Sequence, residues 1–338
     1  MKRFSFQASI QWGKLSFSVG CKRCDAARTS PSADHSPVLD FFAFAHQEVQ
    51  RAARLKSPST IKNYQTAVAE LQRFVGLRPL PFAEVNVALM YEFEHWLRQR
   101  GLTLNTSSCY MRSLRSIYNQ AVDQELTSPA NPFRHVFTGR EKTRKRAAGL
   151  ADIQLLHEAK LKRASRLELT RDLFLFSFYA CGMPFIDMAF LCRDQLHDGY
   201  LEYSRHKTGQ RVCFKLLPCM QQIIDRYAVA DSPLVFPILR GVPEEQYYDV
   251  YQHQIRLYNR RLHMLEERLG TQAPLTSYVA RHTWATLARE SNVEVPVISK
   301  GLGHTNVSTT QIYMRDVNDS RLDEANQKLM AYVFGSPV

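Results

Sequence analysis

The stretch GLGHTNVSTTQIYMRD, residues 301–316, decides how the rest of the chain is interpreted. Two glycines flank Leu302, His304 follows at once, and Tyr313 stands nine positions later in a Thr-rich setting. The pattern predicts a helix start near His304, and free N–H groups at a helix N-terminus bind anions. Taken alone, Tyr313 is equally well explained as the edge of an amphipathic helix, and His304 as a cap.

The overall composition is that of a globular protein with a strong positive charge. The chain has 338 residues, of which 45% are hydrophobic, and this length suits two domains. Its formal net charge is +12 and its pI is about 9.4. Such an excess favours a polyanionic partner, with nucleic acid as the first candidate and an anionic membrane surface as the second.

The cysteines and the first residues indicate a reducing compartment. Seven cysteines are scattered along the chain, and only Cys21 and Cys24 form a CxxC motif. No second Cys or His pair stands at zinc-finger spacing, so unpaired thiols are favoured over a metal site, and no cofactor is expected. The opening MKRFSFQASIQW lacks the apolar core of a signal peptide. We therefore expect a cytoplasmic protein.

The most apolar stretch is LFLFSFYACGMPFIDMAFLC, residues 173–192, which is long enough to span a bilayer. Gly182, Pro184 and Asp187 interrupt it in the middle, where a lipid-facing charge is costly. The interruption predicts two short buried helices that meet at a turn, and no membrane partner.

The first half of the chain reads as an arm followed by a helical domain. Residues 1–36 predict an arm that is short, strand-like or partly disordered. Residues 37–133 predict a compact helical domain with 3.6-residue periodicity at 38–54, 59–75, 86–100 and 104–125. Residues 134–148 predict a linker that contains REKTRKR, with five positive residues in seven. A solvated charge run is the ordinary explanation, but this position favours an extended segment, including Lys142 and Arg144, along a phosphate backbone.

Residues 149–338 predict a second, mixed domain. Strands are expected in 200–216 around the turn Thr208-Gly209. The helices are expected at 150–161, 166–181, 184–191, 218–229, 245–269, 277–290, 294–302, 306–314 and 319–333. The fold class is therefore mostly α with a small β-hairpin sheet.

A set of four residues suits phosphoryl transfer without a metal: Lys207, Arg281, His304 and Tyr313. Lys207 lies beside the hairpin turn, and Arg205 would share its strand face. Arg281 lies in an otherwise apolar helix, where a buried guanidinium needs a partner or an anion. With His304 and Tyr313, the set offers phosphate neutralisation, proton donation and a nucleophile.

The order of these motifs resembles that of the tyrosine recombinases, the phage integrase family. ARHTWATLA (280–288) resembles the family's second-arginine helix, GLGHTNVSTTQIY its histidine–tyrosine box, and HKTGQ (206–210) its lysine hairpin. The resemblance covers about residues 38–335. The motif sequences are most similar to those of the divergent integrases of bacterial mobile elements. It implies a helical core-binding domain followed by a catalytic domain.

The resemblance also implies a mechanism. Tyr313 attacks a scissile phosphate and forms a 3′-phosphotyrosine link, Lys207 protonates the leaving 5′-hydroxyl, and Arg281 with His304 stabilises the phosphoryl charge. Exchange of DNA strands in two rounds requires four copies of the protein on two double-stranded DNA sites. An accessory DNA-bending protein is a further possible partner. Residues 319–333 would dock on a neighbouring copy or pack on their own domain.

The chain departs from the family at two positions. Pro184 stands where the first arginine is expected, and Cys181 stands at the alternative position used by divergent relatives. Tyr278 replaces the usual histidine, and its phenol still donates a hydrogen bond. Arg205 and Arg193 are the candidate substitutes for the missing arginine, because Arg171 would sit about 15 Å up its helix.

Candidate DNA contacts in the helical domain lie at helix starts or on polar helix faces: Thr60, Lys62, Asn105, Thr106, Arg112 and Arg115. Capping is the alternative role for Thr60 and Thr106. Two functional alternatives stay open: a non-catalytic or weakly active DNA-binding protein with the recombinase fold, and a type IB topoisomerase.

Overall fold

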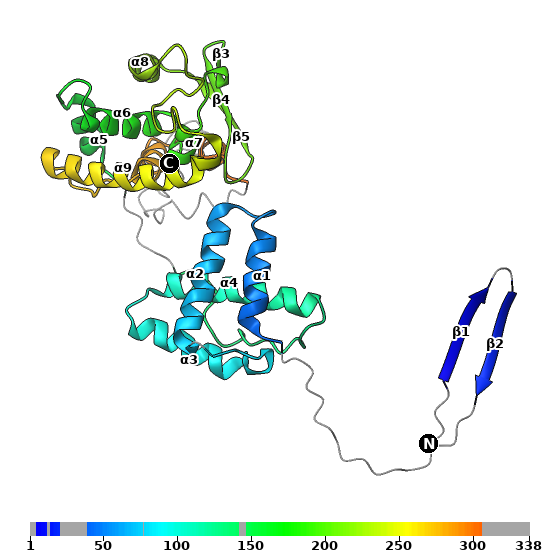
Figure 1. The fold of residues 1–338 in the computed structure, drawn as a ribbon. Helices are drawn as coiled ribbons and strands as arrows, with labels where there is room; N and C mark the ends of the chain where they lie inside the picture. Colours follow the sequence, from blue (N-terminus) through cyan, green and yellow to red (C-terminus); the bar gives the residue numbers. More distant parts are fainter. Residues whose placement is uncertain (1–4, 12–13, 21–38, 77, 142–146, 306–338) are drawn as a thin grey trace, which may run out of the picture. The chain divides into compact units, whose positions relative to one another are not determined.

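The computed structural model describes residues 5–11, 14–20, 39–76, 78–141 and 147–305. The chain divides into two compact units, Met1–Glu141 and Lys142–Val338. Figure 1 follows their elements along the sequence. Each unit is described by itself below.

The first described segment is an antiparallel hairpin of β1 (Ser5–Gln11) and β2 (Lys14–Gly20). Its register places Phe6 opposite Val19 and Gln7 opposite Ser18. The expected arm therefore contains regular strands.

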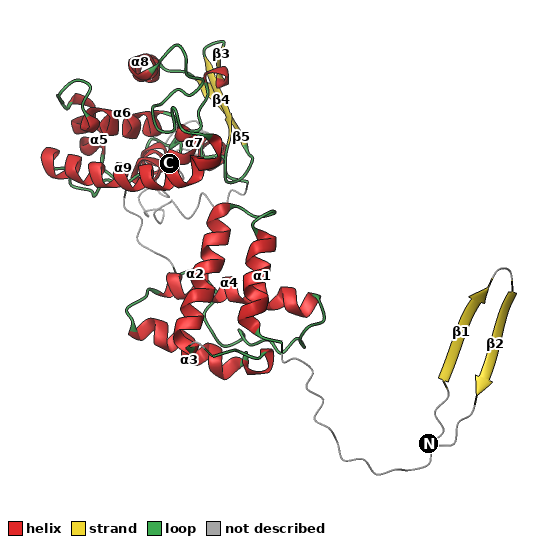
Figure 2. Cartoon of the chain, in the orientation of Figure 1, coloured by secondary structure: helices red, strands yellow, loops and turns green. Residues whose placement is uncertain are grey.

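Four helices and one short 3-10 turn lie in the remaining described residues of the first unit, and Figure 2 shows them in red. The elements are α1 (Phe41–Ala52), α2 (Pro58–Val75), η1 (Phe82–Glu84), α3 (Val87–Gln99) and α4 (Leu104–Asp123). Their bounds lie within three residues of those expected. Side chains cap three of the helices, since Asp40, Asn86 and Thr103 each accept a backbone N–H from the first turn.

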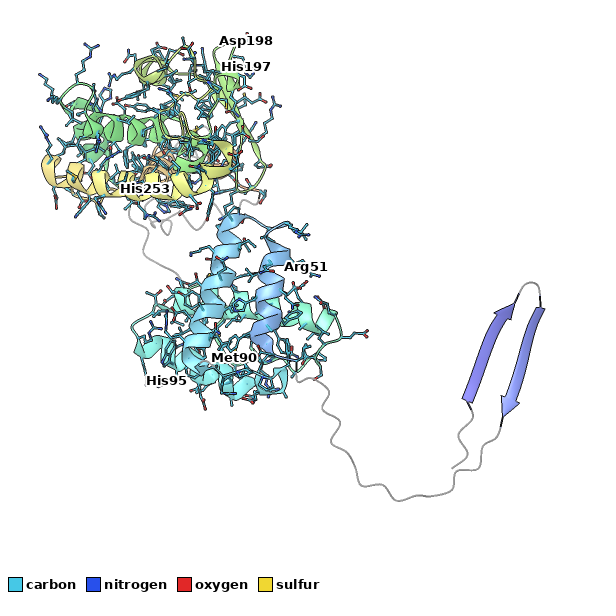
Figure 3. All side chains as sticks on the ribbon, in the orientation of Figure 1. Arg51, Met90, His95, His197, Asp198 and His253 are labelled. Carbon is cyan, nitrogen blue, oxygen red and sulfur yellow. The ribbon has the colours of Figure 1, made fainter. Side chains whose placement is uncertain are left out.

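The apolar faces of these helices form one core. Phe41, Met90, Phe93 and Leu114 are fully buried in it. Figure 3 shows Met90 among the helices, with Arg51 and His95 on the outside. Burial of each large apolar side chain stabilises the unit by about 1.5–3 kcal/mol relative to exposure, so the helical unit has the core of an independent domain.

Residues 134–141 differ from the expected linker, because they pack on the helical unit. Val136 is buried in its core, and the Phe137 N–H donates to Glu94 at 2.9 Å. Glu141 is the last residue of this unit. Sequence periodicity did not detect this packing because the segment is not helical and has one buried apolar anchor.

The second unit combines seven helices with a small sheet within the residues described there. The helices are α5 (Leu150–Glu158), α6 (Arg166–Tyr179), α7 (Phe185–Ala189), α8 (Pro218–Tyr227), α9 (Tyr247–Leu269), α10 (Val279–Glu290) and α11 (Val295–Gly301). Short 3-10 turns are η2 (Arg193–Gln195) and η3 (Glu244–Gln246).

The sheet is antiparallel with strand order β3-β4-β5, from β3 (Leu196–His197), β4 (Tyr200–Ser204) and β5 (Arg211–Lys215). Leu201 pairs with Phe214 in the β4–β5 ladder. The expected hairpin and the mostly α fold class are confirmed. The two-residue strand β3 was not expected because it is too short to show periodicity.

The apolar stretch 173–192 forms α6 and α7, which meet at a turn as expected. α6 packs against α5, α8, α9 and α10, which explains why its second half, residues 173–179, is rich in buried apolar side chains. None of the described helices combines the length and apolar character that a bilayer crossing requires.

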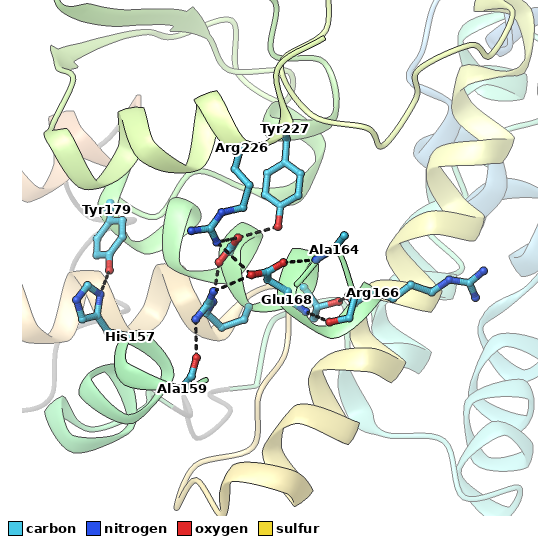
Figure 4. A network of polar contacts seen from close by, with 12 residues as sticks. His157, Ala159, Ala164, Arg166, Glu168, Tyr179, Arg226 and Tyr227 are labelled. Carbon is cyan, nitrogen blue, oxygen red and sulfur yellow. Dashed lines mark hydrogen bonds and ion pairs between the residues drawn. The ribbon is translucent and has the colours of Figure 1, made fainter. Parts of the chain in front are cut away.

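A buried ionic network fixes the start of α6 (Figure 4). Asp172 accepts from Arg171 at 2.6 Å, from Arg226 at 2.5 Å and from Tyr227 at 2.7 Å. Glu168 accepts the Ala164 N–H at 2.7 Å. Every charge in the network has an opposite partner, so its burial is tolerated, and α8 is held against α6.

Candidate functional site

α10 positions Arg281 at the centre of the second unit. The Arg281 side chain is 2% exposed, and the guanidinium donates to the carbonyl oxygens of Gly182 at 3.0 Å and Leu302 at 2.5 Å. Its NH2 group lies 2.9 Å from Nε2 of His304. The helix thus carries a buried cation to the loop that follows α11.

Gly182 makes this placement feasible. It has φ +72°, and a Cβ there would lie 2.8 Å from Arg281 Cα and 2.9 Å from Arg281 Cγ. A side chain would therefore displace the arginine or the turn between α6 and α7.

Arg205 brings a second guanidinium to the same carbonyl. It follows β4, is 7% exposed, and its NH1 group donates to the Leu302 oxygen. Nε lies 2.7 Å from Asp187 Oδ2, an acid of α7 that is itself buried. Burial raises the pKa of Asp187, while the Arg205 guanidinium acts to lower it. Two arginines from different elements therefore converge on one oxygen atom, where each has N–H groups suited to a phosphate oxygen.

The expectation that Arg205 and Lys207 share a strand face is wrong. β4 ends at Ser204, and the N–H groups of Thr208 and Gly209 turn back to the Arg205 carbonyl at 3.3 Å and 2.8 Å. Side-chain alternation stops where the strand stops, so Arg205 is buried while Lys207 is exposed in the turn.

The turn that carries Lys207 is tied to the site at two points. The His206 N–H donates to Asp187 at 2.9 Å, and the Thr208 hydroxyl reaches the Gly303 carbonyl at 3.4 Å. Gly303 has φ +62°, and a Cβ there would lie 2.8 Å from Arg205 Cγ. Asp187 thus orients both the Arg205 guanidinium and the backbone of the lysine turn.

His304 is held in its neutral form. Burial, followed by the charges of Arg281, Arg205 and Lys207, lowers its pKa to about 4. Since an arginine only donates, the contact with Arg281 NH2 makes Nε2 the acceptor and leaves the proton on Nδ1. His304 can therefore donate one hydrogen bond to an anion without carrying a charge.

The positions that replace family residues lie beside this cluster. Pro184 begins α7 and Cys181 lies at the end of α6, with its pKa raised to about 11 by burial. Neither supplies a guanidinium. Tyr278 precedes α10, is 50% exposed, and its ring centroid lies 5.0 Å from that of His282.

Arg193 contacts residues outside the cluster of Arg205, Arg281 and His304. Its NH2 group donates to the Val229 carbonyl at 2.6 Å, and its backbone N–H donates to Pro233. Of the two candidate substitutes for the missing arginine, the structure brings only Arg205 to Arg281. Tyr313, Lys142 and Arg144 lie outside the described residues.

The candidate DNA contacts of the helical unit divide into two kinds. Thr60 and Thr106 bond to the hydroxyls of the N-cap residues Ser57 and Thr103 at 2.9 Å, and Lys62 is exposed on α2. The other three, Asn105, Arg112 and Arg115, bond to residues 138–141.

Asp187, Gly182 and Gly303 are the site residues that sequence reasoning missed. Asp187 gave a usable signal, because a charge within an apolar stretch needs a buried partner. No sequence pattern marked the two glycines, because only the fold shows which atoms a side chain at these positions would contact.

The comparisons with known proteins agree with this fold. Residues 40–138 match the phage integrase SAM-like domain, and residues 205–320 match the phage integrase family. The tyrosine recombinase XerD of Oceanobacillus iheyensis is 22% identical over 298 residues, which cover 86% of this chain and 96% of that protein. XerC of Caldanaerobacter subterraneus subsp. tengcongensis is 24% identical, with 87% of each chain covered.

Two solved structures show the same fold at low identity. A lambda integrase dimer bound to a COC′ core site has a TM-score of 0.61 at 15% identity, covering 82% of this chain and 78% of that one. The Tn1549 transposon integrase in complex with transposon right-end DNA has a TM-score of 0.64 at 13% identity, covering 87% and 100%. The matched family models and the tyrosine recombinase relatives define the class of protein as an enzyme of site-specific DNA recombination. The chain belongs to the phage integrase family of tyrosine recombinases.

Proposed function

We propose that the protein cuts and rejoins DNA at specific sites through a 3′-phosphotyrosine intermediate on Tyr313. The observation that carries this proposal is the convergence of the Arg205 and Arg281 guanidiniums on one oxygen atom beside neutral His304. Such a paired fork suits the non-bridging oxygens of a phosphodiester.

In the proposed reaction a bond forms between Tyr313 Oη and phosphorus, and the bond from phosphorus to the 5′ oxygen breaks. Lys207 gives a proton to the leaving 5′ oxygen, the phenol proton passes to solvent, and Lys207 regains a proton from solvent, so the step has no net change in protons. Arg205 and Arg281 neutralise the phosphoryl charge, while Nδ1–H of His304 and the Tyr278 hydroxyl donate to its oxygens. The covalent link keeps the energy of the phosphodiester, so rejoining needs no cofactor.

Arg205 takes the role of the family's first arginine in this proposal. Support comes from its burial, its ion pair with Asp187 at 2.7 Å, and its contact with the carbonyl that Arg281 also binds. The guanidinium comes from the end of β4, whereas the position on α7 is Pro184.

Duplex DNA is the proposed partner, and the net charge of +12 supports it. A lambda integrase tetramer bound to a Holliday junction shares the fold, with a TM-score of 0.62 and 15% identity. We propose four copies on two DNA sites here too, with residues 319–333 docked on a neighbouring copy, and an accessory DNA-bending protein as a further partner. A reducing bacterial cytoplasm is the compartment this implies.

The helical unit and the basic segment are proposed to hold the other face of the DNA. Lys62 is exposed for phosphate contact, and Lys142 and Arg144 add charge directly after the unit ends. Thr60 and Thr106 stand at helix starts, where backbone N–H groups also favour phosphate.

A nicked suicide substrate built from DNA that flanks the gene tests the proposal. Wild type should accumulate a covalent protein–DNA adduct, and Tyr313→Phe should bind the same DNA without forming one. Equal adduct from both proteins, or none from either on DNA that they bind, would contradict the catalytic proposal.

The second candidate function is a DNA-binding protein without catalysis, which Pro184 at the first-arginine position favours. It predicts salt-sensitive binding and no adduct on any flanking duplex. Relaxation of supercoiled plasmid without a specific site would instead favour a topoisomerase.

A further inference from the structure

One face of α4 binds the last residues of the helical unit. Asn105, Ser108, Arg112 and Arg115 follow one another at spacings of three, four and three residues, so they share a helix face. Each of them hydrogen-bonds a residue between Thr138 and Glu141. We call these four side chains and residues 138–141 the α4 clasp.

The first half of the α4 clasp holds the backbone itself. Asn105 Nδ2 donates to the Glu141 carbonyl at 3.1 Å, and Asn105 Oδ1 accepts the Glu141 N–H at 2.9 Å. The amide thereby satisfies both polar backbone groups of Glu141, as a paired strand would. Ser108, which is fully buried, donates to the Gly139 carbonyl at 2.6 Å.

The second half of the α4 clasp uses two arginines. Arg112 NH1 donates to the carbonyls of Gly139 at 3.0 Å and Thr138 at 3.4 Å, and Arg115 NH1 reaches the Thr138 hydroxyl at 3.2 Å. A guanidinium has five N–H donors, so both side chains keep donors for a second acceptor such as phosphate.

The α4 clasp ends where the basic run begins. Arg140 and Glu141 are exposed, and the sequence continues as Lys-Thr-Arg-Lys-Arg. We propose that the α4 clasp fixes the point from which this run leaves the helical unit, so that Asn105 and Arg112 act as positioning residues for DNA binding by the run. The proposal rests on the proposed function, because it assumes that DNA is the ligand. Pre-ordering the first residues of the run lowers the entropy cost of placing its cations on DNA.

Limited proteolysis of the full chain tests the α4 clasp without DNA. Cleavage after Arg140 requires residues 138–141 to open, and its rate follows the open population. We expect Asn105→Ala to accelerate trypsin cleavage after Arg140 roughly tenfold. The matched control is Asn119→Ala, because within the described residues exposed Asn119 makes no hydrogen bond to residues 138–141. Equal cleavage rates in wild type and Asn105→Ala would overturn the α4 clasp.

A double-mutant cycle on a mixed-sequence duplex separates positioning from direct DNA contact. Asn105→Ala leaves the net charge unchanged, and we expect it to weaken binding about fivefold. In a Lys142→Ala/Arg144→Ala background the same change should cost less than about twofold, because two of the four cations that it positions are absent. Arg112→Lys keeps the positive charge but loses the planar N–H donors of the guanidinium. We expect it to weaken DNA binding as Asn105→Ala does.

Equal losses from Asn105→Ala in both backgrounds would mean that Asn105 contacts DNA directly, and the positioning role would fall. A wild-type chain that binds no duplex at low salt would contradict the proposed function itself. The proteolysis result would still stand in that case, so the two failures are distinguishable.

Discussion

At the scale of the residue, the site depends on Arg205, whose guanidinium is held between Asp187 and the Leu302 carbonyl. We expect Arg205→Ala to slow adduct formation on the suicide substrate by about 100- to 1,000-fold, because one phosphate-stabilising cation is lost. The control is Arg193→Ala, since Arg193 bonds to Val229 instead. Quench-flow or gel assays of the adduct measure both rates.

Removal of Arg205 also leaves Asp187 buried without its cation, which destabilises the fold by about 3–5 kcal/mol. The pair Arg205→Met/Asp187→Asn removes both charges and separates lost chemistry from lost stability. Adduct formation within threefold of wild type in this folded double variant would show that Arg205 has no catalytic role.

Arg205 also shows what the sequence could and could not predict. Residue chemistry identified Lys207, Arg281, His304 and Tyr313 as one set, with Arg205 as a candidate substitute for the missing arginine, because a cation inside an apolar helix requires a partner or an anion. The sequence could not show that Arg205 turns inward while Lys207 turns outward. That difference depends on strand β4 ending at Ser204, and strand ends are set by tertiary contacts such as that of His206 with Asp187.

The contribution of His304 to folding stability depends on pH. Its pKa is about 4 in the folded chain and 6.5 ordinarily, so the unfolded chain binds more protons between these values. The contribution of His304 to stability is complete above about pH 6.5 and is lost as the pH falls towards 4. Because His304 is only half-buried, solvent screening limits this contribution to about 1–2 kcal/mol.

Urea unfolding at pH 7 and pH 4.5 measures the effect. The free energy of unfolding should fall less between these conditions in His304→Gln than in wild type. NMR of the imidazole should show one titration well below the ordinary value in wild type. An unshifted titration near pH 6.5 would contradict the burial of His304 beside Arg281.

At the scale of the element, the turn between α6 and α7 must pass close to α10. Gly182 and Gly199 both have positive φ, at +72° and +76°, but only Gly182 faces a close neighbour, with Arg281 Cα at 2.8 Å. We expect Gly199→Ala to cost about 1 kcal/mol from backbone strain, and Gly182→Ala about 3 kcal/mol or more from strain plus overpacking. Denaturant unfolding of the two variants gives the comparison, and equal costs would rule out the tight approach.

Element types were largely predictable because the 3.6-residue pattern of α2, α4 and α9 is long and regular. The exceptions are β3, with two residues, and the non-helical segment 134–141. The segment 134–141 is set by contacts distant in sequence, such as Phe137 with Glu94, which no local pattern contains. β3 pairs with the neighbouring strand β4 and is too short to show periodicity. Arg112 and Arg115 were correctly placed on one polar face, but their hydrogen bonds to Thr138 and Gly139 were not foreseeable.

At the scale of the whole molecule, the two units have separate cores that share no residue. The first core includes Phe41, Met90, Phe93 and Val136, so it is complete only if the chain extends through the α4 clasp to Glu141. We therefore expect a fragment of residues 39–141 to fold alone with one cooperative thermal transition, followed by circular dichroism and calorimetry. A fragment ending at residue 133 should be less stable by about 2–4 kcal/mol, because it lacks Val136 and the hydrogen bonds of residues 137–141.

The same fragment should bind duplex DNA more weakly than the full chain, and its affinity should depend less steeply on salt, because fewer Lys and Arg side chains reach phosphates. Fluorescence anisotropy over a series of salt concentrations measures both slopes. The ratio of the slopes then divides the phosphate contacts between the units. An unfolded 39–141 fragment would show that the helical unit needs the second unit, and a fragment with the full salt slope would place the DNA contacts on the helical unit alone.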